Sequence, residues 1–93
     1  MGKLVHIEAI IKGVVQGVGY RWFATRKAME YNVNGYIKNL PNGDVQAVVE
    51  GEEGLVKDFL KELRIGPPYA SVSEIITKEG EYTGKYNRFG VAY

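Results

Sequence analysis

A glycine-rich segment near the N-terminus has the residue types that bind an anion. Residues 13–21 read Gly-Val-Val-Gln-Gly-Val-Gly-Tyr-Arg, with three glycines and an arginine. Glycine allows positive φ angles and lets a ligand approach the backbone without a Cβ in the way. Successive N–H groups in such a turn can converge on one anion, and a following helix adds the positive end of its dipole. The segment therefore predicts a phosphate site, although a glycine-rich turn can also be only a turn.

Charge and capping around this segment favour the anion site. Residues 9–29 contain no Asp or Glu, whereas Lys12, Arg21, Arg26 and Lys27 are all positive. The helix expected after the segment has no Ser, Thr, Asp or Asn at its start, so no side chain is available to cap its first N–H groups. Arg21 would be unfavourable beside the positive end of the helix dipole, and a bound dianion would reverse this.

Two common nucleotide-binding patterns do not fit the segment. The dinucleotide pattern that starts at Gly17 requires a glycine at its sixth position, where the sequence has Trp22. The P-loop pattern that starts at Gly13 requires Gly-Lys, where the sequence has Val18-Gly19. Nucleotide binding therefore loses most of its support.

Four further residues could carry either a structural or a functional role. Asn39 stands at the end of an expected strand, where an asparagine is usually a turn residue and a catalytic role is the alternative. Trp22 and Tyr36 are more typical of packing than of binding. His6 lies midway along an expected strand, and nothing nearby in the sequence suggests a catalytic triad, so we interpret it as an ordinary surface or edge residue.

The spacing of apolar residues predicts the elements that position these residues. Residues 5–11 alternate apolar and polar side chains, which predicts a half-buried strand that ends at Gly13. Apolar residues at helical spacing predict helices over 20–31 and 53–64, and Gly66-Pro67-Pro68 ends the second helix. The remaining sequence predicts strands over 33–40, 45–49 and 72–78, an exposed loop over 80–87 and a short last strand over 89–93.

The order βαββαβ with a short final strand is typical of an α+β sandwich of the ferredoxin-like kind. We expect one domain over residues 1–93, with an antiparallel sheet and two helices packed on one face. A right-handed crossover makes the first two strands parallel. The Pro41-Asn42-Gly43-Asp44 turn makes the third strand antiparallel to both, and it lies between them. Residues 13–21 and Asn39 should then lie at the same end of the sheet.

Composition limits the partners and the surroundings of the chain. The 93 residues contain no Cys and one His, which excludes disulfides and the usual zinc sites, so no metal or other cofactor is expected. The 12 basic and 11 acidic residues give a net charge of +1, which argues against a nucleic-acid partner. No apolar run reaches the roughly 18 residues of a membrane span. The lack of Cys fits a reducing cytoplasm, which is the expected location.

Two segments resemble the signatures of the acylphosphatase family. Residues 15–23, Val-Gln-Gly-Val-Gly-Tyr-Arg-Trp-Phe, are similar to the signature loop of that family. Residues 33–39, Val-Asn-Gly-Tyr-Ile-Lys-Asn, with Asn-Gly-Asp-Val at 42–45, resemble its second signature. Residues 66–72 and 89–93 are also similar to family segments, so the resemblance runs nearly from end to end.

The resemblance implies a ferredoxin-like fold and metal-independent hydrolysis of acyl phosphates to carboxylate and inorganic phosphate. Arg21 matches the phosphate-binding arginine of the family, and Asn39 matches its water-positioning asparagine. The expected ligands are a small acyl phosphate, and phosphate or sulfate as a competing anion. The backbone N–H groups that match the phosphate cradle belong to Gln16, Gly17, Val18, Gly19, Tyr20 and Arg21.

Two other classes of function remain open at this point. Ferredoxin-like domains also bind RNA, and Tyr36 is an aromatic residue that such a sheet could expose, but no segment matches the aromatic strand signature of those modules. A carrier or regulatory domain is the other alternative, because modules of the resembled family occur inside larger maturation enzymes. Release of inorganic phosphate from an acyl phosphate separates both alternatives from the enzyme.

Overall fold

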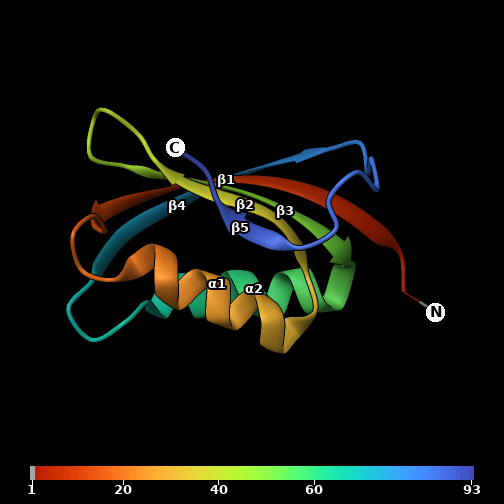
Figure 1. Ribbon diagram of the computed structural model, residues 1–93, viewed down its shortest axis with the longest axis horizontal. Helices are drawn as coiled ribbons and strands as arrows, with labels where there is room; N and C mark the ends of the chain where they lie inside the picture. The colour runs from red at the N-terminus through yellow and green to blue at the C-terminus, as the bar shows by residue number, and fades with distance from the viewer. Residues whose placement is uncertain (1) are drawn as a thin grey trace.

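The computed structural model describes residues 2–93, which form five strands and two helices (Figure 1). Strand β1 (Leu4–Val14) leads through the glycine-rich segment to helix α1 (Tyr20–Tyr31). Strands β2 (Asn34–Asn39) and β3 (Val45–Glu52) form a hairpin, which is followed by helix α2 (Glu53–Ile65). Strand β4 (Ser71–Gly80) and the short strand β5 (Phe89–Val91) complete the fold.

The strands form one sheet in the order β4-β1-β3-β2-β5. Strand β1 pairs antiparallel with β3 and β4, and β3 lies between β1 and β2, which confirms the expected arrangement. Strand β5 pairs parallel with β2, so the sheet is mixed and the expectation of an antiparallel sheet is wrong at this edge. Residues 81–88 connect β4 at one edge of the sheet to β5 at the other edge. Because β4 ends and β5 begins at the same end of the sheet, β5 runs opposite to β4 and therefore parallel to β2.

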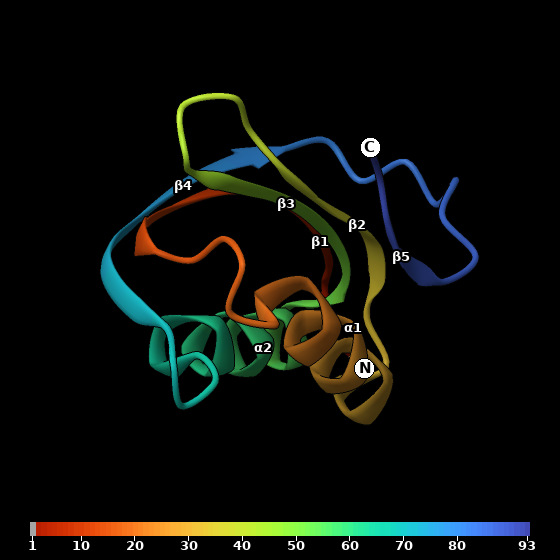
Figure 2. The same cartoon turned by 60° about the vertical axis from the view of Figure 1, so that its left-hand side comes forward.

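Both helices pack against the same face of the sheet, as expected (Figure 2). Helix α1 buries Tyr20, Ala24 and Ala28, whose spacing of four residues places them on one side of the helix. Burying an apolar side chain of this core stabilises the fold by roughly 1.5–3 kcal/mol. The buried residues of α2 are Val56, Phe59 and Leu63. Of the two helices in residues 2–93, neither is long and apolar enough to cross a membrane.

A hydrogen bond to a buried carboxylate overturns the interpretation of His6 as a surface or edge residue. Strand β1 is a central strand, and the His6 side chain is only 19% exposed. Its Nδ1 atom lies 2.6 Å from Oε2 of Glu50, a β3 residue that is 2% exposed. The Glu50 carboxylate also accepts hydrogen bonds from the N–H groups of Thr83 at 2.8 Å and Gly84 at 3.0 Å. The expected loop after β4 is exposed, but this carboxylate anchors it to the sheet.

Candidate active site

The β1–α1 loop and the β2–β3 turn lie at the same end of the sheet (Figure 1). At this end of the sheet lies a cavity of about 380 Å³, a volume typical of small-ligand sites. Gly17, Gly19 and Arg21 line it from the loop and the first turn of α1, and Asn39 lines it from the end of β2. The prediction that residues 13–21 and Asn39 lie at the same end of the sheet is therefore confirmed. The other lining residues are Val15, Tyr20, Trp22, Thr25, Val91 and Tyr93.

The backbone of the loop presents donors that the protein itself does not use. Gly17 and Gly19 have φ angles of 73° and 77°, and a Cβ at either position would meet no atom within 4 Å. Gly19 precedes α1 and offers no side-chain cap, as expected. Within residues 2–93 no backbone carbonyl accepts a hydrogen bond from the N–H groups of residues 16–21, whereas the Phe23 N–H donates to the Gly19 carbonyl at 3.0 Å. These N–H groups form an open helix start, the usual setting for an anion.

The positive charges around the loop differ in their partners. Lys12 Nζ lies 2.7 Å from Oδ2 of Asp44, and this hydrogen bond holds the pKa of the Asp44 carboxyl below its ordinary value. Lys27 Nζ lies within 3.9 Å of carboxylates of two glutamates. Arg21 and Arg26 form no salt bridge with any residue in the range 2–93, and of these four cations only Arg21 lines the cavity. The charge available to an anion in the cavity is therefore that of Arg21.

The side chain of Asn39 is not used by the turn that follows it. Asn42 holds that turn, because its Oδ1 accepts a hydrogen bond from the Asp44 N–H at 3.0 Å, and the Leu40 N–H donates to the Asp44 carbonyl at 2.8 Å. The Oδ1 atom of Asn39 is buried, and nothing in residues 2–93 donates to it. Buried acceptors nearly always have a partner. The geometry therefore disfavours the interpretation of Asn39 as only a turn residue.

The side chain of Gln16 joins the two parts of the site, which the sequence analysis missed. Its Nε2 atom donates to the Leu40 carbonyl at 2.9 Å and to the Asp44 carbonyl at 2.8 Å. One amide thus fixes the position of the loop relative to the turn that follows Asn39. The signal in the sequence was a polar side chain inside a glycine-rich segment, but its acceptors lie 24 and 28 residues away.

Two aromatic side chains complete the wall of the cavity. The interpretation of Trp22 as a packing residue is wrong, because its side chain is 66% exposed and lines the cavity. Tyr93, which the sequence analysis did not consider, lines the cavity beside it. Tyr36 is half-buried and its ring lies 6.1 Å from that of Tyr86, which agrees with a packing role.

The start of α1 is anchored to the second helix. The Tyr20 hydroxyl donates to the Leu63 carbonyl at 2.6 Å, and burial raises the pKa of the Tyr20 phenol. This group therefore stays protonated and serves as a structural donor, while one part of Tyr20 still lines the cavity. Residues 2–93 contain no cluster of three or more His, Cys, Asp or Glu side chains that could hold a metal ion.

Comparisons with known proteins identify the family of the chain. The model of the family described as Acylphosphatase matches residues 7–91. An acylphosphatase of Geotalea uraniireducens is 45% identical over 83 residues, which cover 89% of this chain and 91% of that protein. The crystal structure of acylphosphatase from Bacillus subtilis superposes with a TM-score of 0.92 at 30% identity, covering 96% of this chain and 99% of that one.

The chain also matches a part of a larger protein. The crystal structure of T. kodakarensis HypF superposes with a TM-score of 0.79 at 36% identity, and the match covers all of this chain but 12% of that one. The matches to acylphosphatases, by contrast, span nearly the whole length of both partners. The family model, the identities and the shared fold together show that this chain is a hydrolase of the acylphosphatase family.

Proposed function

We propose that the chain hydrolyses the carboxyl–phosphate bond of acyl phosphates without a metal ion. In this proposal Arg21 and the loop N–H groups bind the phosphoryl group, and Asn39 positions the attacking water. One observation carries the proposal: a single cavity joins an open helix start, an arginine without an acidic partner and a buried amide oxygen without a donor. A phosphoryl dianion beside a water molecule would satisfy all three.

Binding of the phosphoryl group would use donors of the loop and of the first turn of α1, where Gly17, Gly19, Tyr20 and Arg21 line the cavity but Gln16 and Val18 do not. The planar guanidinium of Arg21 is always charged and can donate to two phosphoryl oxygens at once. The N–H groups of residues 16–21 add neutral donors and the positive end of the α1 dipole. Because no carboxylate pairs with Arg21, no acidic side chain in residues 2–93 competes with the substrate for this cation. The same donors stabilise the charge that spreads over the phosphoryl oxygens in the transition state.

The role of Asn39 follows from the chemistry of an amide. Its Oδ1 atom can accept a hydrogen bond from the water and thereby aim the water oxygen at phosphorus, but an amide cannot take up the proton at neutral pH. As the water oxygen bonds to phosphorus, the bond between phosphorus and the carboxylate oxygen breaks, and its electron pair leaves with the carboxylate. One water proton passes to a phosphoryl oxygen, which gives a carboxylate and dihydrogen phosphate. A carboxylate is a good leaving group, so a general acid is not required.

An assay of inorganic phosphate release from acetyl phosphate and benzoyl phosphate tests this proposal. We expect hydrolysis to persist after exhaustive chelation of divalent ions, because one His and no Cys cannot build the usual zinc site, and residues 9–29 contain no carboxylate to bind magnesium beside the loop. Absence of phosphate release would contradict the proposed reaction. Activity that disappears on chelation and returns with added magnesium or zinc would contradict the metal-independent mechanism.

A further inference from the structure

The chain contains two Asn-Gly pairs, and the fold places them in different surroundings. Asn42-Gly43 lies in the β2–β3 turn, where both residues are exposed, and Figure 2 shows this turn projecting beyond the sheet. Asn34-Gly35 begins strand β2, where Asn34 is half-buried and Gly35 is buried. An asparagine before glycine can react with its own backbone, because glycine has no side chain to shield the nitrogen. The two pairs share this chemistry, so only their surroundings distinguish them.

The reaction joins the asparagine side chain to the backbone. The nitrogen of the following residue attacks the side-chain amide carbon, so that a new C–N bond forms and the bond to the amide nitrogen breaks. Ammonia leaves with the proton that the backbone nitrogen loses, and a cyclic succinimide remains. Water then opens the ring at either of its carbonyl groups. The products are aspartate, with the original backbone, and isoaspartate, whose backbone runs through the former side chain.

Hydrogen bonds prepare the side chain of Asn42 for this attack. Its Oδ1 atom accepts from the Asp44 N–H at 3.0 Å, and its Nδ2 atom donates to Asp44 Oδ2 at 3.0 Å. The first of these closes an Asx turn, which brings the side chain back along the backbone of Gly43. The same N–H stabilises the charge that develops on Oδ1 when the amide carbon becomes tetrahedral, as an oxyanion hole does. A Cβ on Gly43 would meet no atom within 4 Å, so the new ring has open space around it.

The attacking nitrogen of Gly43 is held only by the turn itself. Its N–H donates to the Leu40 carbonyl at 3.2 Å, which is a long hydrogen bond in an exposed segment. Exposed turns open locally at little cost, and each opening frees this nitrogen for reaction.

The nitrogen of Gly35, by contrast, is held in the sheet. Its N–H donates to the Arg88 carbonyl at 3.0 Å, and Gly35 also pairs with Val49 of β3. A Cβ on Gly35 would clash with the Val48 carbonyl oxygen, so the neighbouring strand leaves no room for a ring at this position. Reaction at Asn34 therefore requires β2 to separate from its neighbours.

We infer that Asn42 is a self-modification site, at which the folded chain converts asparagine through a succinimide into aspartate and isoaspartate, and that isoaspartate there loosens the β1–α1 loop. The carbonyls of Leu40 and Asp44 lie on either side of Asn42, and both accept from Gln16 Nε2, at 2.9 and 2.8 Å. Isoaspartate adds a backbone carbon between these two carbonyls and so changes their spacing. The Gln16 side chain then no longer reaches both.

Mass spectrometry of tryptic peptides measures both asparagines in one digest. Trypsin cleaves after Lys38, which places Asn34 and Asn42 in separate peptides. In the folded chain at mildly alkaline pH, Asn42 should lose its amide about tenfold faster than Asn34, or more, because a nitrogen in a strand ladder is rarely free. In guanidinium chloride the two rates should be comparable. Equal rates in the folded chain, or an Asn42 that reacts only after unfolding, would overturn the inference.

Asn42→Ala is the control for the position of the reaction, because Asn39 lies in the same tryptic peptide as Asn42. The mass gain of this peptide should disappear in the variant. A gain that persists would place the reaction at Asn39 and contradict the assignment to the turn.

The effect on the loop is measured on the modified chains, which anion-exchange chromatography isolates because each has gained a negative charge. Asn42→Asp is the matched control, since it carries the same charge on an unchanged backbone. Calorimetry of the isolated fraction should show a component that melts roughly 4–8 °C below Asn42→Asp, as expected for a small domain that loses about one hydrogen bond. Equal melting temperatures would overturn the link to Gln16. Neither measurement requires turnover, so a chain without activity would contradict the proposed function but not the modification.

Discussion

At the scale of single residues, the two side chains assigned to the reaction differ in what surrounds them. Arg21 has no acidic partner within residues 2–93, so its charge is available in the free protein. Asn39 has a buried Oδ1 without a donor, next to a turn that another asparagine holds. The free charge of Arg21 suits binding of an anion in the ground state. The unpaired acceptor of Asn39 suits a group that contributes mainly when it holds the attacking water.

We therefore expect Asn39→Ala to act on the chemical step. The substitution should lower kcat and kcat/KM about equally and leave KM nearly unchanged, because in the proposed mechanism it removes an interaction made mainly in the transition state. Loss of one well-placed polar group of this kind typically costs on the order of 10²–10³ in rate. Steady-state kinetics with benzoyl phosphate measures both constants.

Asn42→Ala is the matched control for this prediction. It removes the hydrogen bond from the Asp44 N–H to Asn42 Oδ1 at 3.0 Å, but it leaves Asn39 in place. This variant should lower the melting temperature and leave kcat within a few-fold of wild type. A folded Asn39→Ala variant with near-normal turnover would remove Asn39 from the reaction.

At the scale of elements, the site depends on contacts between segments that are far apart in the sequence. Gln16 joins the β1–α1 loop to the β2–β3 turn through two hydrogen bonds. Glu50 joins β3 to β1 and to the connection that leads into β5. Strand β5 in turn carries Val91 to the cavity. Each of these contacts can be removed by a single substitution that leaves Arg21 and Asn39 unchanged.

Gln16→Ala should loosen the loop from the turn. The variant loses two hydrogen bonds, each worth roughly 0.5–1.5 kcal/mol, so the free energy of unfolding should fall by about 1–2 kcal/mol. The loop donors and Asn39 would no longer be held in register, so kcat/KM should fall as well, because misplacement by about 1 Å can cost on the order of 10²-fold. Denaturant titration and steady-state kinetics on the same sample measure the two effects. Unchanged turnover in this variant would show that the loop keeps its position without the Gln16 side chain.

Glu50→Gln should reveal a pH-dependent contribution to stability. Burial raises the pKa of Glu50, but the hydrogen bonds from His6, Thr83 and Gly84 lower it more, so the pKa lies below its ordinary value of 4.5. The folded pKa is thus lower than the unfolded one, and the carboxylate stabilises the fold above about pH 4.5. This contribution is lost as the pH falls through the lower, folded pKa. Glutamine places an NH₂ group where these donors need an acceptor.

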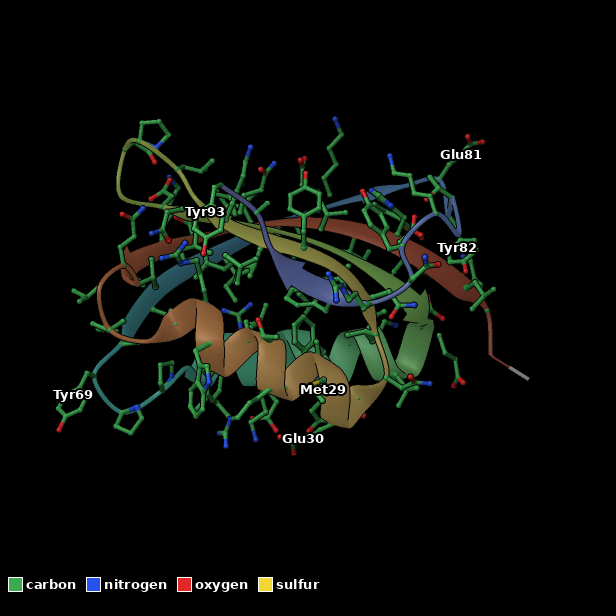
Figure 3. All side chains as sticks on the ribbon, viewed as in Figure 1. Met29, Glu30, Tyr69, Glu81, Tyr82 and Tyr93 are labelled. Atoms are coloured by element: carbon green, nitrogen blue, oxygen red, sulfur yellow. The ribbon has the colours of Figure 1, made fainter. Side chains whose placement is uncertain are left out.

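Melting curves from pH 8 down to pH 3 test this expectation. Above pH 4.5, the ordinary value for Glu50, the Glu50→Gln variant should be about 2 kcal/mol less stable than wild type, and the difference should shrink toward acidic pH. Glu81→Gln is the control, because Glu81 is an exposed carboxylate in the same loop (Figure 3). It should change stability little at any pH. A stability difference for Glu50→Gln that does not depend on pH would contradict the role of the charged carboxylate.

At the scale of the whole molecule, an anion that binds only the folded chain should stabilise all of it. Inorganic phosphate at 100 times its dissociation constant adds roughly 2.7 kcal/mol to the free energy of unfolding. For a chain of this size the melting temperature should then rise by roughly 10–20 °C. Calorimetry with chloride at equal ionic strength separates specific binding from screening. Phosphate should also act as a competitive inhibitor of hydrolysis.

Arg21→Gln identifies where this phosphate binds. The variant loses the charged fork that we assign to the phosphoryl oxygens, so phosphate should raise its melting temperature less than that of the wild type. Turnover should also fall, because in the proposed mechanism Arg21 contacts the phosphoryl group in both the ground and the transition states. An equal rise in both proteins, or inhibition that is not competitive, would place the anion elsewhere than in the loop.

Local patterns in the sequence determined the elements of the fold, whereas the resemblance to a known family supplied the residues proposed for the reaction. Alternating and helical spacing predicted β1, α1 and α2 to within about two residues at each end. The topology of a βαββ unit, together with the turn at Asn42-Gly43, was sufficient to place Arg21 and Asn39 at one end of the sheet. These inferences succeeded because they depend on neighbours in the chain and on general rules of handedness.

Only the tertiary structure decided the contacts made across long separations. His6 and Glu50 are 44 residues apart, and Gln16 and its acceptors are 24 and 28 residues apart, so no local periodicity reveals these pairs. The parallel direction of β5 depends on the route of residues 81–88 around the sheet. Trp22 lies on an ordinary helix turn, and only the fold shows that its side chain is 66% exposed and lines the same cavity as Tyr93. Local spacing specifies which face a residue occupies, but only folding determines which distant group meets that face.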